Sequence, residues 1–489
     1  MAIKLNLSSL KRLPSNVSVP SYDRQALERG IIHVGVGNFH RAHQLVYLDQ
    51  LFNLGLDHDW GVLGAGIMAG DRNMRAKLKK QDWLTTVVDL DEKGLTARIC
   101  GAMIGFVETK ASDLIDALTQ PQIRIVSLTI TEGGYFVDEK TGGFCSTHAD
   151  IEHDSAHPDT PRTVFGILAA SLEKRRVVGL KPFTIMSCDN LPHNGHMTRQ
   201  ALLGLTRLAQ PTLADWIDTN VAFPNSMVDC ITPATSDTEL LKLKNMFGID
   251  DAAPVFCEPF RQWVLEDHFS QGRPRLEKVG VQFVDEVAPY ELMKLRILNG
   301  GHAALAFPSA LMGLHYVHEA MNETSILSYL RKIVEDEVLP TLQPVPGIDF
   351  DEYFKVVIQR FSNPEVGDTI SRLCSDSSNR LPKFILPIIT ANFDSNRLCP
   401  GLTMVVAFWC LYCAASADQN NTNITLIDES SEKLVKQAVL AQDDPIAFLE
   451  MDDVFGSLGR HPMFVEQFCT TLKMISQSGI VAALKKYSM

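Results

Sequence analysis

Short apolar runs alternate with longer segments of helical periodicity through the first half of the chain. The apolar runs predict strands at 31–36, 61–65, 84–88, 123–129 and 183–187. Between them, the segments 39–54 and 162–174 repeat apolar residues at the spacing of an amphipathic helix. This alternation predicts a parallel sheet covered by helices.

The pattern changes in the second half. The proline-bearing, aromatic-rich stretch 254–275 is expected to be connecting structure, and a last short strand is expected at 281–284. From about 289 onward the periodicity is helical, with helices expected at 290–306, 325–338, 352–360, 402–417, 432–440 and 463–476. The sequence therefore predicts an α/β domain over 1–285 and a mainly α-helical domain over 286–489.

Composition narrows the class of protein. The 489 residues carry 45 Lys and Arg against 58 Asp and Glu, and the net charge of −13 disfavours nucleic acid or an anionic membrane as partner. The most apolar stretch, 402–417, contains Thr403 and Ser416 and is shorter than the roughly 20 residues of a bilayer span. Residues 1–12 do not resemble a signal peptide. We therefore expect a cytoplasmic protein that does not enter membranes.

The ten cysteines are dispersed, and without a secretory signal we expect them to be reduced. Cys410 and Cys413 form a single CxxC pair with apolar flanks, and no second pair follows at zinc-binding spacing. We interpret this pair as core packing and predict no metal site.

The expected strand at 31–34 runs directly into Gly-Val-Gly-Asn-Phe-His and then a helix. Gly35 permits a tight turn, Gly37 lets the backbone approach a pyrophosphate, and a helix starting at Asn38 and Phe39 offers free N–H groups. A histidine stands where the third glycine of the fingerprint would be. The motif favours a Rossmann-type dinucleotide site, and an ordinary strand-to-helix turn is the alternative.

An acidic residue follows the second expected strand. Asp71 could accept hydrogen bonds from an adenosine ribose and repel a 2′-phosphate, which favours NAD over NADP. Two alternatives remain at this stage. Asp71 could be a helix N-cap, and the neighbouring Arg72 could bind the phosphate.

Four polar residues group on one expected helix. At about 100° per residue, Glu291, Lys294, Asn299 and His302 share one broad arc. A solvated face with a Lys–Glu pair is the alternative. The two glycines at 300–301 would each weaken a surface helix by about 1 kcal/mol, which favours a partly buried site.

A further candidate stands at the carboxyl end of the strand 183–187, where the sequence reads Cys-Asp-Asn. Open α/β sheets bind ligands at this end of their strands, so Asn190 is expected to project into the binding crevice. An Asx turn or a helix cap is the alternative role for this residue.

Together, four motifs resemble the polyol-specific long-chain dehydrogenase/reductase family, and in particular its members that act on mannitol. The resemblance covers nearly the whole chain. Its motifs are Gly-x-Gly-x-Phe-His-Arg-x-His at 35–43, Thr-Glu-Gly-Gly-Tyr at 131–135, Cys-Asp-Asn at 188–190, and the spacing Lys294-x₄-Asn299-x₂-His302.

The resemblance implies a metal-independent, NAD-dependent interconversion of D-mannitol and D-fructose in a cleft between the two domains. It implies Lys294 as general base, Asn190 and Asn299 as an oxyanion-stabilising pair, His302 as a substrate contact, and Glu291 as a path for protons to solvent. It also places the remaining polyol contacts at Asp229, Arg372 and Arg380. The chain departs from the family pattern at Gly70, where a second acid is expected before Asp71.

Lysine as a base imposes a physical condition. Its ordinary pKa is about 10.4, so burial or a nearby positive charge such as the nicotinamide ring must lower the pKa of Lys294. Glu291 would oppose that change unless it reaches the lysine through water, and we therefore expect a water-mediated proton relay.

Other functions remain open from the sequence. A reductase for fructuronate or tagaturonate would use Arg372 or Arg380 to bind a carboxylate, and an arabinitol dehydrogenase would share the same motifs. A noncatalytic NAD-binding sensor would not need Lys294. The expected partner is a small polyol or ketose, and the oligomeric state, including a monomer, is left open.

Overall fold

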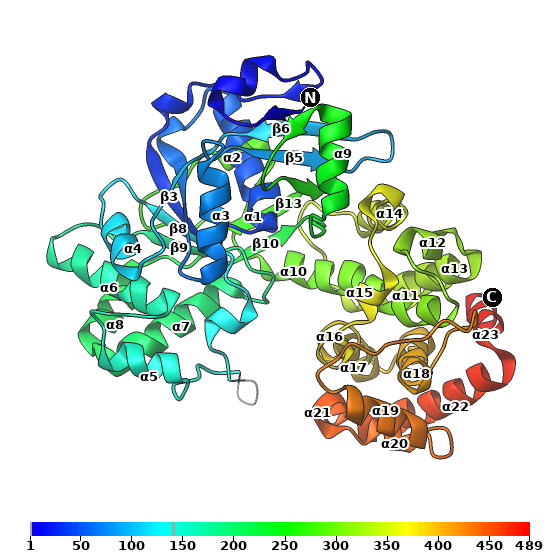
Figure 1. The fold of residues 1–489 in the computed structure, drawn as a ribbon. Coiled ribbons are helices and arrows are strands. Elements are labelled where there is room, and N and C mark those ends of the chain that lie inside the picture. Colours follow the sequence, from blue (N-terminus) through cyan, green and yellow to red (C-terminus); the bar gives the residue numbers. More distant parts are fainter. Residues whose placement is uncertain (1, 139–141) are drawn as a thin grey trace. The chain divides into compact units, whose positions relative to one another are not determined.

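The chain divides into two units, Met1–Ala288 and Pro289–Met489. The computed structural model describes residues 2–138 and 142–489. Every strand of the described residues lies in the first unit, and the second is helical (Figure 1). The predicted Rossmann-type α/β domain followed by a mainly helical domain is therefore confirmed. The boundary expected from the sequence lies after residue 285.

A five-stranded parallel sheet organises the N-terminal unit. Its order is β7-β4-β3-β8-β9, so the first of its strands lies at the centre and the chain builds outward on both sides. This is the 3-2-1-4-5 order of a doubly wound fold, whose ligand crevice lies where the strand order reverses, here between β3 and β8. The strands are β3 (Arg29–Val34), β4 (Gly61–Ala65), β7 (Met103–Phe106), β8 (Ile125–Leu128) and β9 (Thr184–Ser187).

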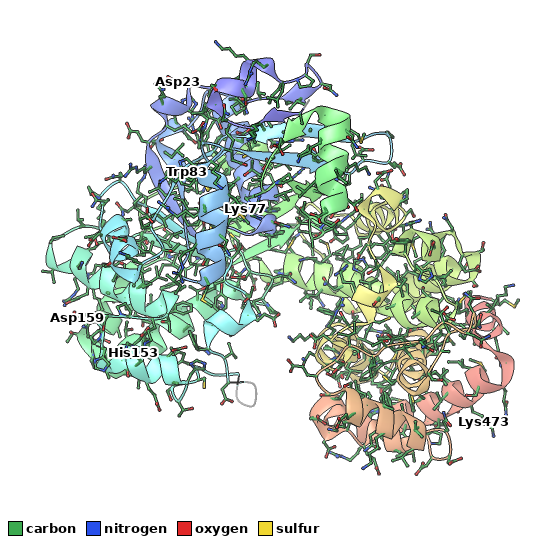
Figure 2. All side chains as sticks on the ribbon, viewed as in Figure 1. Asp23, Lys77, Trp83, His153, Asp159 and Lys473 are labelled. Carbon is green, nitrogen blue, oxygen red and sulfur yellow. The ribbon has the colours of Figure 1, made fainter. Side chains whose placement is uncertain are left out.

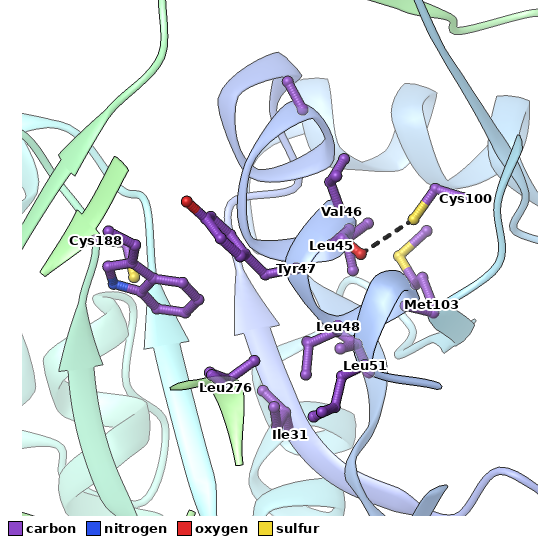
Figure 3. Close-up of a cluster of buried hydrophobic side chains, with 14 of the residues drawn as sticks. Ile31, Leu45, Val46, Tyr47, Leu48, Leu51, Cys100, Met103, Cys188 and Leu276 are labelled. Atoms are coloured by element: carbon purple, nitrogen blue, oxygen red, sulfur yellow. Dashed lines mark hydrogen bonds between the residues drawn. The ribbon is translucent and has the colours of Figure 1, made fainter. Parts of the chain in front are cut away.

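Alternation along β3 places neighbouring residues in different hydrophobic cores. Ile31 packs in a cluster with residues of α2 (Gln44–Asn53), which Figure 3 shows in close-up. In the same cluster the thiol of Cys100 donates to the carbonyl oxygen of Leu45 at 3.2 Å. Ile32 packs in a second cluster with residues of α4 (Ala111–Leu118), α6 (Val164–Val177) and α7 (Asn194–Ala209). The central strand is therefore buried on both faces, as parallel strands usually are.

Two expectations about the smaller sheets are wrong. The strand expected at 84–88 is β5 (Thr85–Asp89), but it belongs to a separate sheet and pairs antiparallel with β6 (Thr96–Cys100). The stretch 254–275, expected to be connecting structure, contains β12 (Val255–Cys257) and β13 (Gln262–Glu266). An apolar run indicates a strand but does not identify the strand with which it pairs. The remaining strands are β1 (Ile3–Lys4), β2 (Val17–Ser18), β10 (Ser226–Asp229), β11 (Ile249–Asp250) and β14 (Gln282–Val284).

The helix expected at 39–54 is interrupted. It divides into α1 (Asn38–Ala42) and α2 at His43, whose backbone leaves the helical region with φ −116° and ψ −85°. His43 is buried, and its Nε2 lies 2.8 Å from the carbonyl oxygen of Gln262. A hydrogen bond to a distant strand thus accompanies the break in a segment of continuous helical periodicity.

The C-terminal unit contains all six expected helical segments. The apolar stretch 402–417 forms α18 (Pro400–Ala414), and Cys410 and Cys413 are buried within it as unpaired thiols, which confirms the core interpretation. The other helices are α10 (Ala288–Lys294), α11 (Gly300–Leu311), α12 (Val317–Asn322), α13 (Thr324–Ile333), α14 (Phe350–Phe361), α15 (Ile370–Cys374), α16 (Ser377–Phe384), α17 (Leu386–Asp394), α19 (Ser431–Leu440), α20 (Ile446–Leu449), α21 (Asp452–Phe455), α22 (Pro462–Ser478) and α23 (Ile480–Ser488).

Exposed lysines lie on helices of both units. Figure 2 shows Lys77 on α3 (Ala69–Lys79) and Lys473 on α22 at the exterior, and both are exposed. Among residues 2–138 and 142–489, no helix combines the length and the apolar character needed to cross a bilayer.

Candidate active site

The turn after β3 has a backbone conformation that favours glycine. Gly35 has a φ of +94°, and a Cβ atom there would overlap the carbonyl oxygen of Thr129, which follows β8. A Cβ atom at Gly37 would meet nothing in the described chain nearer than the Gly35 carbonyl oxygen, at 3.9 Å. The backbone at Gly37 is therefore open to a ligand beside the point where the strand order reverses.

The first two side chains of α1 already have partners. Asn38 Oδ1 accepts a hydrogen bond from Nη2 of Arg41 at 2.7 Å, and the Phe39 ring stacks on His43 with centroids 4.9 Å apart. These contacts fix the start of the helix, whose first N–H groups have no partner within the helix. The turn and the helix start together fit the pyrophosphate of a dinucleotide.

A buried histidine pair supports this turn. The rings of His33 and His40 are parallel within 6°, with centroids 3.3 Å apart. Burial lowers the pKa of His33 to about 3 and the pKa of His40 well below its ordinary value, so both rings are neutral. His33 Nε2 lies 3.1 Å from the Gly35 carbonyl oxygen and 2.9 Å from Thr129 Oγ1. The sequence analysis did not single out His33, although a polar residue inside an apolar strand could have indicated it.

Asp71 lies at the carboxyl end of β4, in the first turn of α3. The N-cap of α3 is Met68 and not Asp71, but Asp71 Oδ2 accepts a hydrogen bond from the Met68 N–H at 2.8 Å, as the third helical residue does in a capping box. In the described part of the chain, its other carboxylate oxygen accepts no hydrogen bond. Asp71 is half-buried and Arg72 is exposed. The cap therefore leaves one oxygen of Asp71 available to a ribose hydroxyl.

Asn190 follows β9 and is exposed at the carboxyl edge of the main sheet. The N-cap of the next helix, α7, is His193. The N–H groups of Gly195 and His196, in the first turn of α7, donate instead to Asn225 Oδ1 at 2.9 and 3.2 Å. Exposure at this edge agrees with the expected ligand-facing role of Asn190, which stays a prediction.

The segment after β8 is strained at the same edge. Thr131 has φ +64° and ψ 166°, a region that is essentially reserved for glycine and costs on the order of 1–3 kcal/mol for other residues. It leads into the short 3₁₀ turn η4 (Glu132–Tyr135). Such strain clusters at functional sites, and no local sequence signal marks it.

Asp229, an expected polyol contact, is the last residue of β10. It is 5% exposed and lies opposite Gln262 of β13 in an antiparallel pair. It therefore belongs to the small sheet β10-β13-β14 and not to the parallel sheet that carries Gly35, Asp71 and Asn190.

The helix expected at 290–306 is not regular. α10 ends at Lys294, the π-helical turn η6 (Leu295–Asn299) follows, and α11 begins at Gly300. The arc calculated at a constant 100° per residue is therefore wrong beyond Lys294, because a π turn holds more residues than an α turn. Lys294 is only 6% exposed and Glu291 is half-buried, so the solvated-face alternative is also wrong. π turns occur often at functional sites.

Asn299 and His302 both present unused polar atoms. The Asn299 side chain makes no hydrogen bond with any described residue, although its Oδ1 is buried. His302 is 5% exposed, stacks on Phe361 with centroids 4.0 Å apart, and has an Nε2 with no hydrogen-bond partner in the described chain. Burial, aided by nearby arginines, lowers the pKa of His302 well below its ordinary value. The ring is neutral and can donate or accept one hydrogen bond at Nε2.

The two expected arginine contacts differ in their surroundings. Arg372 is exposed and makes two 2.6 Å hydrogen bonds to the carboxylate of Asp368, which lies 3.9 Å from His302 Nε2. Arg380 is half-buried, and its Nη1 donates to the carbonyl oxygens of Arg372 and Leu373, both at 3.1 Å. Sequence analysis missed Asp368, whose signal was its i,i+4 spacing from Arg372.

The structure thus groups the expected residues within each unit. Gly35, Gly37, Asp71 and Asn190 share the carboxyl edge of the main sheet, and Lys294, Asn299 and His302 follow one another across the π turn. The described residues contain no cluster of three or more His, Cys, Asp or Glu side chains placed to hold a metal ion. The expected cleft between the two parts stays a prediction.

Both units match known family models. Residues 29–278 match the "Mannitol dehydrogenase Rossmann domain" and residues 286–476 match the "Mannitol dehydrogenase C-terminal domain". A mannitol 2-dehydrogenase of Cereibacter sphaeroides is 49% identical over 480 residues, with 96% of this chain and 99% of that protein covered. One from Aspergillus fumigatus is 40% identical over 498 residues, with 99% of each chain covered.

Solved structures agree with these matches. A Pseudomonas fluorescens mannitol 2-dehydrogenase in ternary complex with NAD and D-mannitol is 43% identical, with a TM-score of 0.88 and 99% of both chains covered. A D-sorbitol dehydrogenase in substrate-free form is 35% identical, with a TM-score of 0.90 and coverage of 98% of this chain and 100% of that one. The similarity therefore extends over the whole fold.

Proposed function

This chain belongs to the mannitol dehydrogenase family, and on that premise we propose that it is an NAD-dependent oxidoreductase that interconverts D-mannitol and D-fructose. The observation that carries the proposal is the buried Lys294 at the start of a π turn that also holds Asn299, whose amide makes no hydrogen bond within the described chain. A relative that binds NAD and D-mannitol supports both the cofactor and the substrate.

The N-terminal unit would hold the cofactor. The tight turn at Gly35, the open backbone at Gly37 and the start of α1 at Asn38 and Phe39 would bind the pyrophosphate. The unused oxygen of Asp71 would bind the adenosine ribose. When bound, NAD accepts the hydride from the substrate in oxidation and returns it in reduction.

The side chains would manage the proton and the charge. In oxidation, Lys294 takes the hydroxyl proton at C2 of the polyol, while Asn190 and Asn299 donate amide N–H hydrogen bonds to the oxygen as it gains alkoxide-like charge. In reduction, Lys294 returns the proton. Glu291, half-buried one turn before Lys294, would pass protons to solvent through water.

The remaining contacts would orient the substrate. We assign a hydroxyl contact to the neutral His302 and further hydroxyl contacts to Asp229, Arg372 and Arg380. The hexuronate alternative requires an arginine that binds a carboxylate, but Arg372 is already committed to Asp368 by two hydrogen bonds. In a hexuronate reductase, Arg380, which pairs with backbone carbonyl oxygens and not with a carboxylate, would therefore have to bind the acid.

We expect the purified protein to oxidise NADH with D-fructose and to reduce NAD⁺ with D-mannitol, as followed by absorbance at the NADH band. EDTA should leave both rates unchanged, because the proposal assigns the proton and the charge to side chains. A panel of arabinitol, sorbitol and fructuronate would rank the alternatives. Loss of activity with EDTA that zinc restores, or faster turnover of fructuronate than of fructose, would contradict the proposal. Absence of turnover with every substrate would favour the NAD-binding sensor.

Asp71 should set the coenzyme preference. We expect a higher kcat/KM with NADH than with NADPH, and Asp71→Asn should narrow the ratio by about tenfold or more, since like charges in contact cost several kcal/mol and about 1.4 kcal/mol is tenfold. Asparagine keeps an oxygen for the Met68 N–H, so this variant removes the negative charge without removing the hydrogen bond at the start of α3. Asp71→Ala should narrow the ratio equally and also destabilise α3 by about 0.5–2 kcal/mol. A wild type that prefers NADPH would refute the assignment.

We also propose that the enzyme works in the cytoplasm. All ten cysteines are free thiols, and eight of them are buried. Proteins of reducing compartments keep thiols in this state, whereas secreted domains commonly pair them.

A further inference from the structure

Asp189 is a buried carboxylate immediately before Asn190, and each of its polar groups is held. Its Oδ1 accepts from the Thr131 N–H at 2.9 Å, and its Oδ2 accepts from the Ile130 N–H at 3.0 Å and from the Tyr135 hydroxyl at 2.6 Å. No lysine, arginine or histidine in the described residues forms an ion pair with it. Hydrogen bonds, and not a counter-ion, therefore satisfy this carboxylate.

The backbone of Asp189 is fixed as well. Its N–H donates to Ser187 Oγ at 3.3 Å, and its carbonyl oxygen accepts from Asn194 Nδ2 at 3.0 Å. Ser187 Oγ is also 2.6 Å from the Tyr135 hydroxyl. The residue before Asn190 consequently has little freedom, and the network joins the segments that follow β8 and β9.

The same carboxylate holds strained backbone. Thr131 has a φ of +64°, and its N–H is one of the donors to Asp189. Thr131 and Glu132 are exposed at the edge of the sheet where Asn190 is exposed. Without its anchor, this segment would relax toward an ordinary conformation. The network therefore keeps two neighbouring loop ends in one arrangement.

We propose that Asp189, together with Tyr135, is a positioning residue that fixes Asn190 and the strained Thr131 in one arrangement for hydride transfer. The inference rests on the role proposed above for Asn190. Asparagine at 189 would keep the shape of the side chain but turn an NH₂ group toward a backbone N–H of Ile130 or Thr131. That one contact would become repulsive and release part of the segment.

The test is a double-mutant cycle on kcat. Asp189→Asn should lower kcat by about 10- to 100-fold, because small misplacements of reacting groups cost up to about 100-fold. The NADH dissociation constant should stay within about twofold of the wild-type value, because residue 189 lies outside the Gly35 turn. In an Asn190→Ala background, Asp189→Asn should cause little further loss of kcat. Tyr135→Phe, which removes one hydroxyl, should cause a smaller loss that disappears in the same background.

Asp154 provides a control in the same unit, although its Oδ1 also lies 3.0 Å from His153 Nδ1. It is also buried, and it accepts from the Arg162 N–H at 2.7 Å, the Thr163 N–H at 2.9 Å and the Thr163 hydroxyl at 2.7 Å. Asp154→Asn should lower the melting temperature without lowering kcat.

Three results would overturn the inference: wild-type kcat in folded Asp189→Asn, an undiminished further loss in the Asn190→Ala background, or an equal loss of kcat in Asp154→Asn. If Asp189→Asn does not fold, Tyr135→Phe carries the same cycle, and wild-type kcat in it overturns the inference. Wild-type kcat in Asn190→Ala alone would instead remove the role proposed for Asn190, and the positioning role with it.

Discussion

Lys294→Ala should lower kcat for mannitol oxidation and fructose reduction by about three orders of magnitude, within the range of about 10²–10⁴ for general acid–base catalysis. NADH affinity should stay nearly unchanged, because the lysine is assigned to the substrate and not to the coenzyme. Initial rates in both directions and an NADH fluorescence titration on the folded variant would measure the two effects. A small primary amine should restore part of the oxidation rate by replacing the base.

The pH dependence gives an independent check of this assignment. Oxidation requires the neutral amine, so its rate should rise with pH, while reduction requires the ammonium and should fall. His302 should not contribute near neutral pH, because its pKa lies well below the ordinary value and the ring stays neutral there. In Lys294→Ala both slopes should flatten.

A half-buried lysine of the same unit, already paired with a carboxylate, serves as the control. Lys332 on α13 lies 3.4 Å from Asp336 in an i,i+4 pair. Lys332→Ala should cost less than about 1 kcal/mol of stability and leave kcat unchanged. Wild-type kcat in folded Lys294→Ala would end the proposal that this lysine is the base.

Asn299→Ala should lower kcat by about 10²–10³-fold, or about 2.7–4 kcal/mol of transition-state stabilisation, as loss of one oxyanion donor typically does. Its melting temperature should hardly change, because the amide has no partner among the described residues and its Oδ1 is already buried unpaired. Steady-state kinetics and thermal unfolding on one preparation would test both parts. Asn190→Ala should show a loss of kcat of the same order.

Substitution of a second asparagine in the C-terminal unit should have the opposite effects on kcat and melting temperature. Asn392 is fully buried, and its Nδ2 donates to the carbonyl oxygens of Glu337 at 2.8 Å and Ile388 at 2.9 Å. Asn392→Ala should lower the melting temperature, with kcat unchanged in the protein that remains folded. If Asn299→Ala behaves like Asn392→Ala, Asn299 is a structural residue and not an oxyanion donor.

The parallel sheet could be predicted because its strands are buried on both faces and read as continuous apolar runs. The segments at 31–36 and 123–129 therefore correspond to β3 and β8 with shifts of a few residues at their ends. The run at 84–88 was equally apolar, yet β5 pairs antiparallel in another sheet. The choice of partner strand depends on segments that are distant in sequence, so local composition does not predict it.

Some features of the candidate site could likewise be predicted from the sequence, and others could not. Gly35 could be predicted because its role follows from its residue type, and the structure shows that its φ and its distance from Thr129 both require glycine. The strain at Thr131 could not be predicted, because a β-branched residue is the least expected choice at positive φ. The π turn could not be predicted either, since periodicity analysis assumes a constant angle per residue.

The π turn η6 amounts to one extra residue inserted into an otherwise continuous helix. If the five residues Leu295–Asn299 formed a regular α-helix instead, everything that follows would rotate by about 100° relative to Lys294, which is the rotation of one extra α-helical residue. The side chain of His302 would then point in another direction, although the amino-acid sequence around it had not changed. The five residues of the π turn therefore set the direction of His302 relative to Lys294. They should be kept together when this segment is grafted into another scaffold or aligned with a relative of different length.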